Sequence, residues 1–281
     1  MPPDAGVTGA RRLPRQLAPR QLAPRPASGV GAVPNATIVG RIDCSPTIVR
    51  LLVRPDAGVP AFAPGQYLAL GVPADGGLLL RPYSTASPRG EDRALEFLIR
   101  LVPGGALTPR LWTLREGDRL RVGPPKGVFT DEASDPRRRL FLATGTGLAP
   151  LVSMLVSRLR EVPDGAARRR PIVVHGASLQ HDLAYRDRLS ELAAAGRIRY
   201  VPVVSRPADP ANAGWRGATG RVDAVLPEVL ASSAADPHDV LAFICGGPGV
   251  VGSATAALGH LGVPAAAIHA EAYWSAPGAP S

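Results

Sequence analysis

Residues 140–155 read LFLATGTGLAPLVSML, and this stretch decides the fold of the second half of the chain. A short apolar run ends at Gly145 and Gly147, and a run with helical spacing follows, with Pro150 near its first turn. A strand, a tight turn and a helix in this order begin a parallel α/β unit. Backbone amides at such a helix start can hold a phosphate or a carboxylate. Because Pro150 replaces the third glycine of the dinucleotide fingerprint, the motif alone is weak, and such glycines more often form simple turns.

The same rhythm continues to the C-terminus. Further strand-like runs lie at 171–178, 197–205, 239–247 and 267–274, with helical stretches between them. This alternation predicts a five-stranded parallel sheet with helices on both faces, in a domain spanning residues 134–281. The fourth run ends at Cys245-Gly246-Gly247-Pro248, on the edge where open α/β sheets bind ligands. A cysteine at this place is usually a small core residue.

Residues 34–133 have a different pattern, with six short strand-like runs separated by Gly, Pro and Asp. The runs lie at 36–44, 47–55, 66–73, 77–86, 94–102 and 118–125. This spacing predicts a six-stranded antiparallel β-barrel or sandwich, and we expect the barrel. An acidic, proline-containing linker near residues 131–136 separates it from the α/β domain. The predicted fold class is therefore two domains, an antiparallel barrel followed by an α/β sheet.

Composition narrows the classes of function. The formal charge is +9, carried almost entirely by arginine, and Lys126 is the single lysine. Nucleic-acid binding is disfavoured because the arginines are scattered or lie in the N-terminal tail, and a coding bias towards arginine is the favoured explanation. No apolar run approaches the roughly 18–20 residues of a spanning helix, so we expect a cytoplasmic protein without membrane contact. Two distant cysteines exclude a four-cysteine cluster within the chain, and five histidines show no metal-ligand spacing.

Residues 1–33 contain the near-repeat RQLAPRQLAPRPAS at 15–28 and no apolar periodicity. This composition predicts a disordered leader rich in Arg, Pro and Ala. A targeting peptide is the less favoured interpretation, because the prolines would interrupt an amphipathic helix.

The stretch RPYSTASP at 81–88 is unusual for a half-buried strand. Alternation would send Arg81 and Tyr83 to one side and Pro82 and Ser84 to the other. Core packing does not require this set, whereas a flat ligand that carries phosphate would use it. The alternative is an arginine in a surface ion pair beside a tyrosine that fills the core.

A series of motifs in a fixed order carries a resemblance to a known family. They are RPYS (81–84), GALTPRL (105–111), GD-RLRVGPPKGVF (117–129), ATGTGLAP (143–150), VVSR (203–206), TGR (219–221), CGGPG (245–249) and AEAYW (270–274). From about residue 36 to 274 the chain resembles the ferredoxin–NADP⁺ reductase family, especially its bacterial branch. The resemblance implies an FAD-binding barrel followed by an NADP-binding domain.

For FAD, the resemblance implies that Arg81 binds the flavin phosphate, that Tyr83 packs on the isoalloxazine ring, and that Ser84 lies near flavin N5. These roles suit a planar charged fork, a flat aromatic face and a hydroxyl. Thr108 is expected to be the N-cap of a helix beside the pyrophosphate. The residues expected to bind FAD are Arg81, Pro82, Tyr83, Ser84, Leu98, Ala106, Leu107, Thr108, Thr146, Tyr273 and Trp274.

For NADPH, the resemblance implies that Arg206 and Arg221 bind the 2′-phosphate, with Ser205 adding a hydroxyl. Bacterial relatives often carry a further arginine where this chain has Ser178, so strict discrimination against NADH is left open. The residues expected to bind NADP are Gly145, Gly147, Pro150, Ser178, Ser205, Arg206, Arg221, Cys245, Gly246, Gly247 and Pro248.

The residues expected to take part in catalysis are Ser84, Cys245, Glu271 and Trp274. The resemblance makes Trp274 a gate over the flavin face, with Tyr273 beside it, whereas a tryptophan packed into a domain interface is the alternative. Glu271 is expected to relay protons near Ser84 and Cys245, unless it is an exposed glutamate at a strand end with no role.

The expected function is hydride transfer between NADPH and FAD, followed by single-electron transfer to ferredoxin or flavodoxin. The protein is expected to be a monomer that meets an acidic carrier near Arg89, Arg93 or Arg110. Two alternatives remain. The chain could be an NAD(P)H-dependent flavin reductase or the reductase component of an oxygenase, or it could be a flavin-binding module without turnover.

Overall fold

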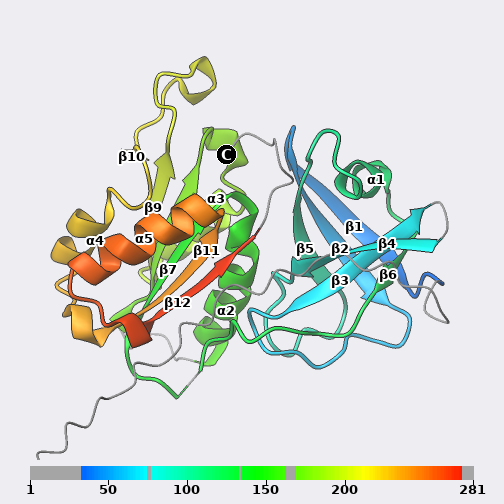
Figure 1. The fold of residues 1–281 in the computed structure, drawn as a ribbon, viewed down its shortest axis with the longest axis horizontal. Coiled ribbons are helices and arrows are strands. Elements are labelled where there is room, and N and C mark those ends of the chain that lie inside the picture. The colour runs from blue at the N-terminus through cyan, green and yellow to red at the C-terminus, as the bar shows by residue number, and fades with distance from the viewer. Residues whose placement is uncertain (1–32, 75–76, 133, 162–168, 274–281) are drawn as a thin grey trace, which may run out of the picture.

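The structure is a computed structural model, and it describes residues 33–74, 77–132, 134–161 and 169–273. Two domains lie side by side, the N-terminal one on the right of Figure 1 and the C-terminal one on the left. The predicted leader, apart from Val33, and the predicted gate Trp274 lie outside the described residues.

The N-terminal domain is a six-stranded antiparallel sheet, as predicted. Its strands follow the order β4-β3-β6-β1-β2-β5. They are β1 (Ala36–Ser45), β2 (Ile48–Pro55), β3 (Tyr67–Ala74), β4 (Gly77–Ser84), β5 (Leu95–Arg100) and β6 (Arg119–Val122). A bridge between Thr85 and Phe97 joins the two edge strands β4 and β5, so the sheet closes on itself.

The barrel interior is filled by apolar side chains that alternate along the strands. Leu51 and Val53 of β2, Phe97 of β5 and Leu120 of β6 are fully buried in one cluster. The short helix α1 (Thr108–Thr113) adds Leu111 to this cluster. The predicted cap of α1 is wrong, because Leu107 holds the N-cap position. The Thr108 hydroxyl instead accepts the backbone N–H of Val102 at 2.9 Å, and it makes no bond to the helix start.

The C-terminal domain is a parallel sheet in the order β10-β9-β8-β7-β11-β12. Its strands are β7 (Arg138–Thr144), β8 (Ile172–Ala177), β9 (Arg199–Val204), β10 (Ala218–Thr219), β11 (Val240–Gly246) and β12 (Ile268–Ala272). The sheet therefore has one strand more than the five predicted. The extra strand β10 has two residues and pairs with Val203 and Val204, so it is too short to show a periodicity in the sequence.

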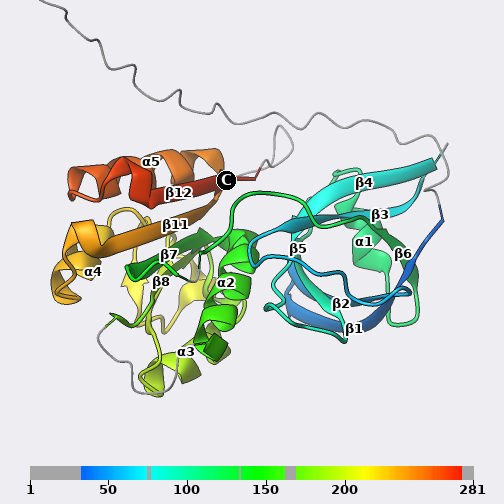
Figure 2. The same cartoon turned by 90° about the horizontal axis from the view of Figure 1, so that it is seen from below.

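Four helices cover the two faces of this sheet. Figure 2 shows α2 (Leu148–Glu161) and α3 (Arg186–Ala194) on one face, with α4 (Leu226–Ser232) and α5 (Pro248–His260) on the other. β7, β8 and β11 are therefore buried along almost their whole length. The chain runs from β7 outwards to β9 and returns to β11, so the strand order reverses between β7 and β11. In open α/β sheets this switch point is where ligands bind.

The two domains share apolar contacts. Ile48, Ala86, Leu98 and Phe129 of the barrel domain belong to the same buried cluster as the core of the α/β domain. The barrel domain thus presents its β2 and β5 side to the α/β domain, beside the carboxyl edge of the parallel sheet (Figure 1).

Candidate active site

The carboxyl ends of β7 and β11 approach each other so closely that only glycine fits between them. A Cβ built on Gly147 would overlap the backbone carbonyl of Cys245. A Cβ on Gly246 would lie 2.7 Å from the Thr144 hydroxyl oxygen. Helix α2 begins at Leu148, directly after Gly147, and helix α5 begins at Pro248, two residues after Gly246. Two helix starts and bare backbone at a switch point fit the pyrophosphate of a dinucleotide.

Tyr273 closes this edge from the end of the chain's last described strand. Its backbone N–H donates to the carbonyl of Gly246 at 3.1 Å, and its hydroxyl donates to the carbonyl of Thr144 at 3.1 Å. Burial raises the pKa of the Tyr273 hydroxyl, so it stays a neutral donor at ordinary pH. Tyr273 therefore lies against the glycine turn of the α/β domain.

Ser84, Cys245 and Glu271 meet across the two domains. Cys245 and Glu271 are register partners on β11 and β12. The Ser84 side chain, at the end of β4 in the barrel domain, lies near enough to the Glu271 carboxylate to affect its pKa. Burial raises the pKa of Glu271, and the nearby Ser84 hydroxyl opposes that rise. Burial, together with the Glu271 charge, raises the pKa of the Cys245 thiol well above its ordinary value. The three predicted catalytic residues within the described chain thus form one group.

Arg81 and Tyr83 lie on β4, opposite Leu70 and Leu68 of β3. The Arg81 guanidinium donates to the carbonyl of Leu80 at 2.7 Å, and in the described part of the chain it forms no ion pair. That observation speaks against the surface ion pair weighed as the alternative for Arg81. Tyr83 is half-buried against the barrel core, and burial raises the pKa of its hydroxyl to about 12. An arginine without a carboxylate beside an aromatic side chain fits a flavin phosphate and ring.

The other predicted FAD residues lie in several places. Pro82 pairs with Ala69, Thr146 is half-buried in the glycine turn, and Leu98 packs in the cluster between the domains. Ala106 is exposed, and its carbonyl accepts from Arg110, while Leu107 is buried in the barrel core. The side chains of Leu98 and Leu107 thus pack in apolar cores.

The predicted 2′-phosphate residues gather at the carboxyl ends of β8, β9 and β10. The buried side chain of Asn212 donates to the carbonyls of Ser178 at 3.0 Å and Arg206 at 2.7 Å. Ser205 and Arg206 are exposed beside it, and the Ser205 N–H donates to Ala177 of β8. Arg221 follows β10 by two residues, so its backbone starts at the same edge.

Arg221 already has two hydrogen-bond partners within the protein. Its Nε donates to Asp223 at 3.2 Å, and its Nη2 donates to the Ser253 hydroxyl of α5 at 3.1 Å. The Arg221 side chain of this ion pair is 60% exposed, so a phosphate competes with a weak interaction.

Sequence reasoning missed Asn212, Arg100 and Asp182. Asn212 ends a Pro-Ala turn capped by Asp209, and the turn sequence Asp-Pro-Ala-Asn at 209–212 was the available signal. Arg100 ends β5 of the barrel domain, yet its guanidinium reaches the position where a Cβ on Gly145 would lie, at 3.4 Å. It pairs there with Asp182 of the other domain, and no local pattern could indicate that contact.

Membrane-spanning helices and metal-binding groups are both absent from the described residues. None of the helices seen there has the length and apolar character needed to cross a membrane. In the same residues, no group of three or more His, Cys, Asp or Glu side chains is arranged to hold a metal ion.

Comparisons with known proteins agree with this geometry. The model of the oxidoreductase FAD-binding domain matches residues 41–130, and that of the oxidoreductase NAD-binding domain matches residues 141–255. A ferredoxin–NADP reductase B of Sorangium cellulosum is 39% identical over 226 residues, covering 78% of this chain and 88% of that protein. A ferredoxin–NADP reductase of Pseudomonas aeruginosa is 33% identical over 214 residues, 72% of this chain and 80% of that protein.

A solved structure shows the same arrangement of domains. The cytochrome P450 reductase GcoB of Amycolatopsis superposes with a TM-score of 0.73 at 29% identity, covering 85% of this chain and 69% of that one. The glycine-lined edge, Arg81 on β4 and the group of Ser84, Cys245 and Glu271 are thus parts of a two-domain flavoprotein oxidoreductase that binds FAD and a nicotinamide nucleotide. The chain belongs to the ferredoxin–NADP reductase family.

Proposed function

We propose that this chain is a ferredoxin or flavodoxin–NADP⁺ reductase, with FAD held by residues 34–133 and NADPH by residues 134–281. The observation that carries the proposal is the contact of Ser84 with Glu271 beside Cys245. It joins the strand that carries the flavin motif to the nucleotide edge of the other domain. Bound FAD supplies both hydride and single-electron chemistry.

The residues of the chain bind, orient and hold protons. Arg81 provides a charged fork for the FAD phosphate, and Tyr83 provides a flat face for the ring. Gly145, Gly147, Gly246 and Gly247 leave the backbone at the switch point open to the nucleotide. Glu271 accepts a proton more readily than an exposed carboxylate, because burial raises its pKa, and its Ser84 partner can pass a proton on towards the cleft.

NADPH is proposed over NADH because Ser178, Ser205, Arg206 and Arg221 start from one edge of the sheet. A 2′-phosphate placed there would meet two guanidinium groups, which bind phosphate in a planar, bidentate way. NADH offers no group that would use this charge.

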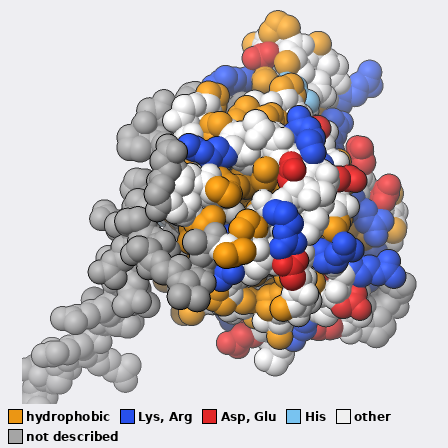
Figure 3. All heavy atoms as spheres, turned by 90° about the vertical axis from the view of Figure 1, so that its right-hand side faces the viewer, with side chains coloured by type: hydrophobic (Ala, Val, Ile, Leu, Met, Phe, Trp, Pro, Cys, Tyr) orange, Lys and Arg blue, Asp and Glu red, His pale blue; other side chains and the backbone are white. Residues whose placement is uncertain are grey.

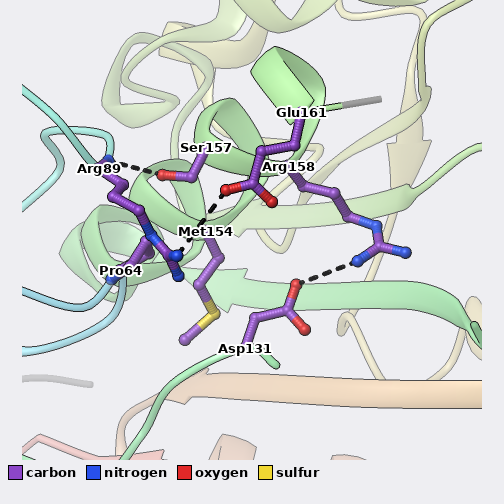
Figure 4. Close-up of a pocket in the computed structure, with 7 residues that line it drawn as sticks. All are labelled: Pro64, Arg89, Asp131, Met154, Ser157, Arg158 and Glu161. Atoms are coloured by element: carbon purple, nitrogen blue, oxygen red, sulfur yellow. Dashed lines mark hydrogen bonds and ion pairs between the residues drawn. The ribbon is translucent and has the colours of Figure 1, made fainter. Parts of the chain in front are cut away.

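The carrier is proposed to be an acidic one-electron protein that meets a monomer of this chain. Figure 3 shows the end of the molecule formed by the barrel domain, where basic, acidic and apolar side chains are interspersed. Of the predicted carrier residues, Arg89 lies 3.9 Å from Glu161 of α2, so part of its charge is already balanced (Figure 4). Arg93 and Arg110 are exposed and are expected to contribute more. We place the reaction in the cytoplasm, where the free thiols of Cys44 and Cys245 would stay reduced.

A reductase component of an oxygenase is the second candidate. The Amycolatopsis cytochrome P450 reductase favours it, because this chain superposes on 69% of that protein with a TM-score of 0.73 at 29% identity. Such a component would pass electrons to a separate partner protein rather than to a carrier that serves many enzymes.

The experiment that tests the proposal is a panel of electron acceptors. The purified flavoprotein is reduced with NADPH, and its reoxidation is followed with a ferredoxin, a flavodoxin, and free FMN. Fast reoxidation by ferredoxin or flavodoxin is expected. Preference for free FMN would indicate a flavin reductase, and a protein that NADPH does not reduce would be a binding module without turnover.

A further inference from the structure

The segment between β8 and α3 makes polar contacts with the barrel domain. Asp182 has 5% of its surface exposed, and three side chains of the barrel domain donate to its carboxylate. They are the hydroxyls of Ser45 at 2.6 Å and Thr47 at 3.1 Å, and the guanidinium of Arg100 at 3.3 Å. A buried carboxylate is stable only when its oxygens are satisfied in this way. Here every donor in that set comes from the neighbouring domain.

Ser45 is already held in place before it meets Asp182. Its hydroxyl oxygen accepts the backbone N–H groups of Thr47 at 3.1 Å and Ile48 at 3.0 Å, within the hairpin turn between β1 and β2. The hydroxyl proton is then left to point at Asp182. The tip of the hairpin in Figure 1 faces this segment. The geometry of one domain thus determines where the other must present its carboxylate.

Tyr185 makes the second contact, and its backbone is strained. Its φ of 60° lies in the left-handed region, which costs a non-glycine residue free energy. The Tyr185 hydroxyl donates to Glu96 Oε1 of β5 at 2.6 Å. The Arg50 guanidinium lies 4.3 Å from the centre of the Tyr185 ring and also pairs with Glu96. Because burial raises the pKa of Tyr185, its hydroxyl remains a donor to this carboxylate.

On another part of the interface, contacts come from α2. The Ser153 hydroxyl donates to the carbonyl of Ser87 at 2.5 Å, and the Arg89 N–H donates to the Ser157 hydroxyl at 2.8 Å. Figure 4 shows the second of these, at a small pocket lined by residues of both domains. The interface also includes the apolar side chains Ile48, Leu98 and Phe129, which belong to the same buried cluster as the core of the α/β domain. Apolar burial is non-directional, so directional hydrogen bonds are needed to determine the angle between the domains.

We propose that Asp182 and Tyr185 are positioning residues that hold the barrel and α/β domains at the angle at which FAD and the nicotinamide nucleotide react. The inference rests on the proposed function for its kinetic part and on the interdomain contacts alone for its structural part. A misplacement of about 1 Å can cost about 100-fold in rate, so a small change of angle is sufficient to matter.

The test compares the double variant Asp182→Asn/Tyr185→Phe with the wild-type holoprotein. Two control variants remove similar groups away from the interface. Tyr200→Phe loses a hydroxyl of a half-buried side chain that bonds His175 inside the α/β domain, and Asp236→Asn loses a carboxylate that caps a turn. If the double variant does not fold, Ser45→Ala removes one of the three bonds to Asp182 from the barrel side.

Two measurements are made on each protein. Amide hydrogen exchange reports opening of residues 45–50, 96–100 and 178–186, and stopped-flow absorbance reports flavin reduction at saturating NADPH. In the double variant we expect faster exchange in these three segments and flavin reduction slower by about 10-fold, within the range that misalignment produces. Flavin content and the concentration of NADPH at half-saturation should stay within about 2-fold of the wild type, and the controls should match the wild type.

Exchange and reduction rates equal to those of the controls would overturn the proposal. Faster exchange with an unchanged reduction rate would also overturn it, because the contacts would then stabilise without positioning. A wild-type protein that neither NADPH nor NADH reduces would contradict the proposed function instead. In that case the exchange measurement still decides whether the two residues hold the domains together.

Discussion

Arg81 carries a charge that no carboxylate in the described part of the chain balances. We predict that Arg81→Ala yields protein with little flavin, because hydrogen bonds to a charged group contribute about 1.5–3 kcal/mol. The Kd for FAD should rise about 10- to 150-fold, measured by fluorescence titration of the apoprotein. Arg54→Ala, at an exposed arginine of β2, is the matched control. Full flavin occupancy in Arg81→Ala would refute this role of Arg81.

Arg206 and Arg221 are the residues on which coenzyme preference should depend. For Arg206→Ala/Arg221→Ala we expect KM for NADPH to rise by about 10-fold or more, because the 2′-phosphate loses charge-assisted bonds. KM for NADH should change by less than about 2-fold. Arg188→Ala removes an exposed arginine of α3 that pairs with Glu191, and it should affect neither coenzyme. Equal losses with both coenzymes would show that the arginines do not recognise the phosphate.

Glu271 gives a prediction about pH. Burial raises its pKa in the folded protein, so the folded state binds a proton more tightly than the unfolded chain does. Below the ordinary pKa of 4.5, Glu271 is protonated in both states and does not destabilise the folded protein. As the pH rises through the pKa of Glu271 in the folded protein, the buried carboxylate becomes charged and the free energy of unfolding falls. Glu271→Gln removes this loss, so its Tm should exceed that of the wild type at pH 7, and the excess should shrink towards pH 4.

Calorimetry between pH 4 and pH 8 checks this prediction. Glu228→Gln, at an exposed position on α4, is the control and should show no such trend. A Glu271→Gln excess that is constant with pH would mean that Glu271 is charged at little cost in the folded protein.

At the scale of elements, the sequence was sufficient to predict the positions of most strands. The runs at 36–44, 47–55 and 94–102 appear as β1, β2 and β5 within a few residues, because alternation and Gly or Pro punctuation mark them. β10 was not predicted, since two residues show no period. The cap of α1 was predicted wrongly because the Thr108 hydroxyl bonds Val102, six residues before it, instead of the helix.

The glycine turn between β7 and α2 carries a prediction at this scale. Gly147→Ala should place a Cβ against the carbonyl of Cys245, and overpacking of this kind typically costs about 1–3 kcal/mol. We expect a lower free energy of unfolding together with weaker NADPH binding. Gly259→Ala in α5 is the control, because no atom lies within 4 Å of its added Cβ. It should be neutral or stabilising by up to about 1 kcal/mol, since alanine favours a helix. A Gly147→Ala protein as stable as the wild type would contradict the close approach of β7 and β11.

At the scale of the whole molecule, the order of the two domains could be predicted, but of their contacts only the approach of Ser84 to Glu271 was expected, and that from the family resemblance. The Ser45–Asp182 bond joins residues 137 positions apart, and the Tyr185–Glu96 bond joins residues 89 apart. Such pairs form only when the two folded domains pack together, and no local sequence pattern predicts how the domains pack. The candidate site shows the same division, because the glycine turns and RPYS were visible in the sequence while Asn212, Arg100 and Asp182 were not.

The central claim is that the chain holds FAD in one domain so that a nicotinamide nucleotide on the other can reduce it. The most direct test is to mix the purified protein with NADPH under anaerobic conditions and to measure the absorbance of the flavin over time. A yellow protein that NADPH bleaches in a single turnover, faster than NADH does, is the result that we predict. A colourless protein that takes up no added FAD, or a bound flavin that stays oxidised with both coenzymes, would contradict it.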